Sequence, residues 1–222
     1  MNTTRANQTS SGFTALRNLM RPQRPEAERE ICEFCSVNLS LPHRHLLEIA
    51  PRKIICTCDP CALRFENVID GRFKLIPRDG RALPDFQLTD AQWENLALPI
   101  NLVFIFNNSL AGKPTAAYPS PAGATESLLT LECWQTMVAE NPKLKELEPD
   151  VEALLINRIG QAREYFIAPM DACFELVGLI RKHWRGFSGG EDVWREIENF
   201  FSRLREETSA GTPPDLREAV YV

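Results

Sequence analysis

Five of the seven cysteines lie close together, in the pattern Cys32-x-x-Cys35 followed by Cys56-x-Cys58-x-x-Cys61. A tight turn between paired cysteines aims both sulfurs at one point, so two C-x-x-C pairs can offer four thiolates to a single ion. Disulfides would not explain this clustering, because we expect the chain to lie in a reducing compartment. The spacing therefore predicts a tetrathiolate metal site made by Cys32, Cys35, Cys58 and Cys61.

The ligand type limits which metal this site can hold. Tetrahedral thiolate sites hold zinc or iron, and a zinc site closed by four protein ligands is structural rather than catalytic. We expect zinc, with a rubredoxin-like iron or an iron–sulfur cluster as alternatives. A module this small buries little apolar area, whereas structural zinc contributes about 10 kcal/mol or more of apparent folding free energy. We therefore expect the metal to be required for folding.

Cys56 is a fifth thiol whose role the pattern leaves open. Alternation along a strand would place Cys56 and Cys58 on one face, which makes Cys56 a possible alternate ligand or a free thiol beside the metal. The spacing of Cys58 and Cys61 matches the first pair, and unpaired cysteines are often buried. We therefore favour Cys58 as the ligand and expect Cys56 to be a small, buried residue.

His43 and His45 follow the first cysteine pair, where treble-clef nucleases of the HNH type also place histidines. Such enzymes use a histidine base and a second metal ion to cut phosphodiesters. No histidine follows Cys61 in the expected helix, so the ligands of that second metal are missing and the nuclease is the least favoured alternative. We keep both histidines as candidate partner-binding residues at the surface or beside the metal ligands.

These residues need a small scaffold to position them. Residues 45–49 and 53–57 are short apolar segments that predict a β-hairpin, and Asp59-Pro60 then opens a helix that carries Cys61. A knuckle, a hairpin and a closing helix are typical of a treble-clef or zinc-ribbon-like module. We expect five regions: a flexible arm (1–30), the cysteine-rich module (31–76), a linker (77–92), an α+β domain (93–208) and a tail (209–222).

The predicted domain 93–208 alternates strand and helix patterns. Residues 100–106 and 113–118 predict one hairpin, and residues 151–157 and 164–168 predict another. Apolar residues repeat with helical period over 126–140, 170–184 and 191–208. The fold class is therefore α+β, with β-hairpins and three main helices beside the small metal module.

The segment between residues 118 and 127 is rich in proline and small residues, and we expect it to run from a strand into a helix. Its amides and the helix N-terminus can bind an anion or a peptide, which makes Tyr118, Ser120, Gly123 and Thr125 candidate partner-binding residues. The alternative is a proline-stiffened turn in which Thr125 is the helix N-cap.

Composition and missing motifs exclude several functions. The net charge of −5 argues against a nucleic-acid partner, because neutralising phosphates requires a concentrated basic surface. No apolar run reaches the roughly 18 residues of a membrane helix, and the N-terminus lacks a signal sequence, so we expect a cytoplasmic protein without a membrane partner. Nucleophile elbows, phosphate-binding glycine loops and H-E-x-x-H motifs are absent, so no motif indicates an enzyme, and a non-enzymatic protein is favoured without an enzyme being excluded.

Three stretches carry a resemblance to a known family: Cys32-Glu-Phe-Cys-Ser-Val-Asn-Leu-Ser-Leu-Pro-His-Arg-His, Ile55-Cys-Thr-Cys-Asp-Pro-Cys, and Tyr118-Pro-Ser-Pro-Ala-Gly-Ala-Thr-Glu-Ser. Together they resemble an uncharacterised bacterial family encoded beside high-affinity uptake [NiFe]-hydrogenases of the actinobacterial type. The resemblance implies an accessory, maturation or chaperone-like protein whose partner is a [NiFe]-hydrogenase subunit or maturation factor. A rubredoxin-like electron carrier is the alternative from another functional class.

Overall fold

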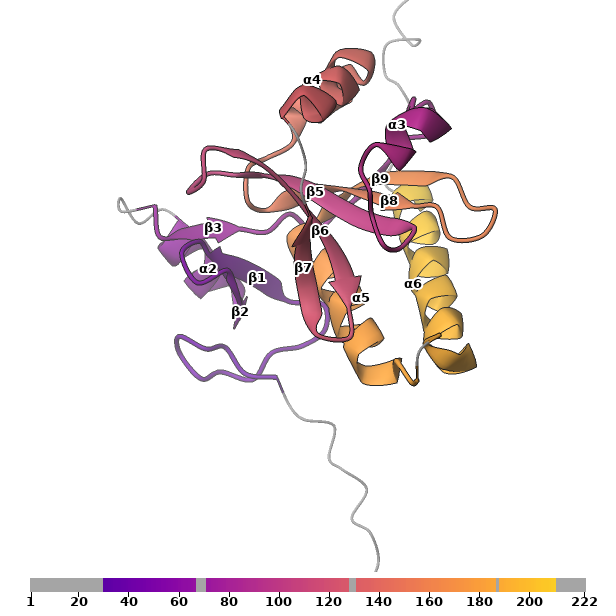
Figure 1. The fold of residues 1–222 in the computed structure, drawn as a ribbon. Helices are drawn as coiled ribbons and strands as arrows, with labels where there is room; N and C mark the ends of the chain where they lie inside the picture. Colours follow the sequence, from indigo (N-terminus) through magenta and orange to yellow (C-terminus); the bar gives the residue numbers. More distant parts are fainter. Residues whose placement is uncertain (1–29, 67–70, 128–130, 187, 211–222) are drawn as a thin grey trace, which may run out of the picture.

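The computed structural model describes residues 30–66, 71–127, 131–186 and 188–210, and it contains a small sheet and a large sheet (Figure 1). The predicted arm and tail lie outside these ranges, except for residue 30 and residues 209–210. The mixed α+β class predicted from the sequence is confirmed. None of the helices in the described ranges combines the length and the apolar character that a bilayer crossing requires.

The cysteine-rich module forms the small sheet, drawn in purple beside the large one in Figure 1. Its strands are β1 (Arg44–Glu48), β2 (Lys53–Thr57) and β3 (Phe73–Leu75), paired antiparallel in the order β2-β1-β3. Helix α2 (Asp59–Glu66) follows β2 directly. The predicted hairpin and the helix opened by Asp59-Pro60 are therefore confirmed.

Three phenylalanines make most of the aromatic packing inside the module. The rings of Phe34 and Phe65 stack with centroids 3.9 Å apart, and Phe73 meets them edge-on at 5.6 and 6.0 Å. Phe34 comes from the turn between the first two cysteines, Phe65 from α2 and Phe73 from β3. This cluster is small, which supports the expectation that a metal ion must add to the stability of the module.

The large sheet is antiparallel and has six strands in the order β4-β9-β8-β5-β6-β7. Its strands are β4 (Arg81–Ala82), β5 (Leu102–Asn108), β6 (Lys113–Ser120), β7 (Gly123–Ser127), β8 (Glu152–Asn157) and β9 (Glu164–Pro169). Both predicted hairpins are present as β5–β6 and β8–β9.

Helices cover both faces of the large sheet. Helices α5 (Met170–His183) and α6 (Gly190–Ala210) pack over one face, around a core that includes Phe104 and Phe201. Helices α3 (Asp90–Glu94) and α4 (Leu131–Glu140) and the 3₁₀ helix η1 (Pro142–Glu146) lie toward the other face. Because both faces are covered, β5 is an apolar run from Leu102 to Phe106 without alternation.

Two predicted boundaries differ from the structure. The helix predicted over 126–140 starts only at Leu131, because residues 123–127 turn back and pair with β6 as strand β7. The segment 77–92, predicted as a linker, does join the module to the larger domain. It also supplies β4, which pairs with the edge of β9, and the start of α3. Both differences depend on strand partners that a local sequence pattern does not reveal.

The module is packed against the larger domain by apolar and charged contacts. Leu47 of β1 and Ile76 share a buried cluster with Val151 beside β8. Lys74 of β3 lies 3.2 Å from the carboxylate of Asp150, whose side chain is only 2% exposed. The two parts therefore share an interface rather than being joined by the chain alone.

Candidate metal centre

The first cysteine pair lies in a tight turn that the backbone itself closes. The amide of Ser36 donates to the carbonyl of Cys32 (2.8 Å), and the amide of Cys32 donates to the carbonyl of Val37 (2.8 Å). Ser36 has a φ of 60°, the left-handed conformation that lets the chain reverse after Cys35. This geometry points Cys32 and Cys35 to the same side.

The second pair lies at the start of α2. The carbonyl of Cys58 accepts the first helical hydrogen bond, from the amide of Ala62 at 2.9 Å, so Cys58 is in the N-cap position. Cys61 follows within the first turn. A residue at the N-cap and one three positions later lie over the same end of the helix, which explains the convergence of their sulfurs.

The structure brings all four predicted ligands together, with their sulfur atoms within 4.8 Å of one another. The sulfurs of Cys35 and Cys58 are 3.7 Å apart. Zinc–sulfur bonds of about 2.3 Å in a tetrahedron place two sulfurs about 3.8 Å apart, so this distance fits a shared ion. Cys32 is buried, Cys35 is exposed, and Cys58 and Cys61 are partly buried. The donor set and its spacing can therefore hold one tetrahedral metal ion.

The thiols of this cluster differ in acidity. Burial acts to raise the pKa of Cys32, but backbone amides of Cys58, Cys35 and Phe34 outweigh it and lower that pKa to about 6. Burial and the neighbouring thiols raise the pKa of Cys61 to about 12. Cys32 therefore loses its proton more readily than Cys61, which must be deprotonated before it can ligate a metal.

Glu33 connects the cysteine turn to strand β2. Its carboxylate accepts a hydrogen bond from the amide of Cys56 (3.1 Å) and pairs with the ammonium of Lys53. The hydrogen bond from Lys53 holds the pKa of Glu33 below its usual value. The Glu33 amide also donates to the carbonyl of Cys56 (3.0 Å), so the first pair is fixed to the strand that precedes the second pair.

Cys56 lies apart from the four-cysteine cluster and groups with His43 and His45. The expected alternation does not bring Cys56 beside Cys58, because β2 ends at Thr57 and the chain turns into the N-cap of α2. Cys56 is partly buried rather than fully buried. The carboxylate of Asp171 lies outside this group but contacts it, 2.7 Å from Nδ1 of His45. Asp171 is 126 positions away in the sequence, and no local pattern indicated it.

The segment 118–127 forms the hairpin β6–β7 instead of leading into a helix. Tyr118 pairs with Thr125, and Ser120 pairs with Gly123 across a two-residue turn. The Ser120 hydroxyl lies within hydrogen-bond distance of the Gly123 carbonyl (2.9 Å) and the Thr125 hydroxyl (3.0 Å). Thr125 lies in strand β7 and is therefore not an N-cap, and no helix begins within the described residues 118–127. The role of these residues in partner binding remains a prediction.

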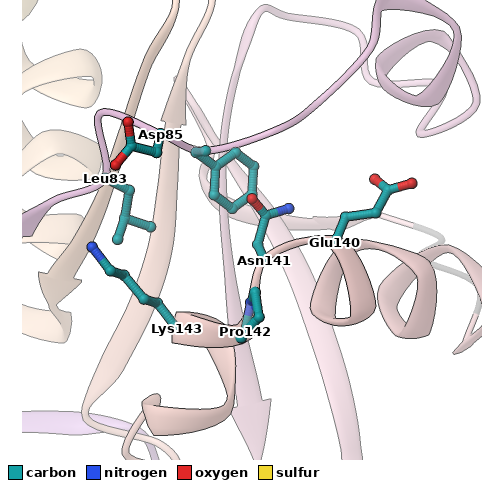
Figure 2. A pocket seen from close by; sticks show the side chains of 7 residues that line it. Leu83, Asp85, Glu140, Asn141, Pro142 and Lys143 are labelled. Carbon is teal, nitrogen blue, oxygen red and sulfur yellow. The ribbon is translucent and has the colours of Figure 1, made fainter.

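Figure 2 shows a separate pocket, where residues 83–86 meet the end of α4. The buried Asn141 amide donates to the carbonyls of Gln87 (2.9 Å) and Met137 (3.0 Å) and accepts from the Gln87 amide (2.7 Å). These bonds fix the 77–92 segment to the larger domain. The nitrogen and the oxygen of the Asn141 side chain thus both have hydrogen-bond partners within the fold, so the role of Asn141 in this pocket is structural.

Comparison with known proteins gives a family but no relative of known function. Residues 31–208 match the family described as "Family of unknown function (DUF5947)". No curated protein and no solved structure matches the chain.

Proposed function

The chain belongs to this family of unknown function, and we propose from its own residues that it is a zinc-stabilised accessory protein rather than an enzyme. One observation carries the proposal: the four sulfurs of Cys32, Cys35, Cys58 and Cys61 converge within 4.8 Å. Four protein ligands complete a tetrahedral zinc site and leave no position for substrate. The ion then stabilises the module, and the surface of the module performs the function.

Exposed apolar side chains on the module support a protein partner. Of the six large hydrophobic side chains that are most exposed in the described residues, four belong to the module. They are Ile31, Val37, Leu41 and Leu63, with exposed fractions of 48, 49, 80 and 59%. Exposed apolar side chains that gather in one patch mark protein interaction sites, and these four come from the segment before β1 and from helix α2 of one small module. The partner we propose is a [NiFe]-hydrogenase subunit or maturation factor, which rests on the sequence resemblance.

Gene deletion with complementation tests this role. Deleting the gene should abolish or delay hydrogenase maturation, measured as cofactor insertion and hydrogen uptake. Leu41→Ser should fail to restore maturation, whereas Leu110→Ser, a matched change at another exposed leucine, should restore it. Wild-type maturation in the deletion strain would contradict the proposed partner.

An iron electron carrier is the second candidate, and the exposure of Cys35 favours it. A ligand sulfur at the surface gives a redox metal a short path to an electron-transfer partner. Colour separates the two candidates, because a ferric tetrathiolate centre absorbs visible light and zinc does not. Protein purified in air that is colourless and contains zinc excludes the carrier.

A further inference from the structure

Two histidines and a cysteine converge on the face of the module that meets the larger domain. His45 and Cys56 are cross-strand partners in the β1–β2 pair, and His43 lies two positions before His45. His43 immediately precedes β1, its ring lies 4.7 Å from that of His45 between centroids, and cross-strand partners such as His45 and Cys56 have Cβ atoms about 5 Å apart. One ligand atom from each of the three side chains lies within 4.8 Å of the others.

The imidazole of His43 has unmet hydrogen-bonding capacity. Its side chain is only 6% exposed, and both ring nitrogens are buried with no hydrogen-bond partner in the described residues. A carboxylate oxygen of Glu30 lies 3.3 Å from Nδ1 of His43. Buried polar atoms without hydrogen-bond partners destabilise the folded state. A metal ion on Nε2 removes one of these deficits, and Glu30 is placed to accept the proton on Nδ1.

The imidazole of His45 is oriented from the larger domain. Its Nδ1 lies 2.7 Å from the carboxylate of Asp171, in the first turn of α5. A carboxylate that accepts the Nδ1 proton leaves the lone pair on Nε2 free to ligate a metal. Histidine ligands in metal sites commonly make this hydrogen bond to a carboxylate.

We propose that His43, His45 and Cys56 form a second metal site that takes Zn²⁺, with Asp171 and Glu30 orienting the two imidazoles. Two imidazoles and one thiolate suit zinc and related divalent transition metals such as Co²⁺. Three protein ligands leave a fourth position for water or an incoming ligand, as in zinc sites that perform chemistry. This site differs from the four-cysteine cluster, which its own ligands close.

A cleft of about 560 Å³ next to the histidines gives access to this site. His43, His45 and Asp171 of α5 all line the cleft. The cleft is lined by four carboxylates but only one arginine: Asp79, Asp171, Glu175, Glu207 and Arg78. Its negative charge favours entry of a cation. Because the ligands lie on the module and Asp171 on α5, the ion also strengthens the contact between the two parts.

Co²⁺ binding to the full-length protein tests the second site. The starting material is protein that holds one zinc in the four-cysteine cluster, and Co²⁺ alone is the probe. One further equivalent of Co²⁺ should bind and give a thiolate-to-cobalt charge-transfer band. Cys56→Ser should remove the band, and Asp171→Asn should weaken Co²⁺ binding about 10- to 100-fold. Cys133→Ser, the same chemical change in α4, should leave the band intact.

Zinc retained in each variant shows that the module is still folded. If the four-cysteine cluster also takes Co²⁺, two equivalents bind, and Cys56→Ser must still lower the count by one. A failure of the four-cysteine site is therefore distinguishable from a failure of the second site. Absence of a Co²⁺ equivalent that depends on Cys56 overturns the proposal. A charge-transfer band that survives Cys56→Ser also overturns it, provided that the four-cysteine cluster still holds its zinc.

Discussion

The substitution Cys58→Ser isolates the contribution of one metal ligand from the local fold. Cys58 has two roles: its sulfur joins the four-thiol cluster, and its carbonyl begins helix α2 at the N-cap. Serine is among the residues most favoured at an N-cap, so the helix start is preserved while the thiolate is lost. Any loss of stability in this variant therefore reports on the metal.

The size of the effect follows from the ligand count. Structural zinc contributes about 10–16 kcal/mol of apparent binding energy, so one of four equal thiolates accounts for about 3 kcal/mol. We therefore expect Cys58→Ser to bind zinc roughly 100-fold more weakly than the wild type. Weaker binding should also lower the hydrogen-exchange protection of β1, β2 and α2, because their stability depends on the ion.

Competition for zinc with a chromophoric chelator measures this affinity, and hydrogen exchange over residues 44–66 measures the protection. Cys133→Ser is the control, since Cys133 lies in α4 outside the cluster. It should keep wild-type affinity. Wild-type affinity in Cys58→Ser would refute the reasoning, because it would mean that another group, such as Cys56, replaces the lost thiolate.

Three further predictions concern the interface, its pH dependence and the nuclease alternative. Leu47→Ala should lower the free energy of unfolding by about 2–4 kcal/mol in urea titrations, because it leaves a cavity against Ile76 and Val151; an effect below 1 kcal/mol would count against a packed interface. Burial acts to raise the pKa of Asp150, but the hydrogen bonds from Ser109 and the ammonium of Lys74 outweigh it and hold that pKa below its usual 3.8. The ionised carboxylate of Asp150 therefore stabilises the fold fully above pH 3.8, and this stabilisation is lost as the pH falls through the lower pKa that Asp150 has in the folded protein. Asp150→Asn should flatten the acid limb of the curve of stability against pH, and an unchanged limb would contradict this. Supercoiled plasmid should stay intact with the protein and added Mg²⁺, Mn²⁺ or Zn²⁺, and metal-dependent nicking would revive the nuclease alternative.

The cysteine turns and the start of α2 could be predicted from the sequence, because each depends only on residues that are neighbours in the chain. Each C-x-x-C pair needs only a tight turn, and Asp59-Pro60 marks the start of α2 regardless of the rest of the fold. Hairpins such as β5–β6 also follow from short-range patterns of strand and turn residues. The predicted bounds of these elements therefore agree with the structure to within a few residues.

The remaining features depend on contacts between distant segments. Gly123 to Ser127 is a strand because β6 lies beside it, although residues 126–140 fit a helical period. Arg81 and Ala82 form a strand because β9 offers its edge. The grouping of Cys56 with the two histidines depends on the β1–β2 register and on where β2 ends, and Asp171 joins it only through the packing of α5 against the module.

The metal content of the purified protein tests the central claim most directly. Full-length protein prepared with reduced thiols and dialysed against a weak chelator should be colourless and retain at least one zinc per chain, the ion of the four-cysteine cluster. Under the same conditions, Cys58→Ser should lose most of its zinc, and Cys133→Ser should keep it. Folded wild-type protein that contains no metal, or that contains iron and absorbs visible light, would contradict the account.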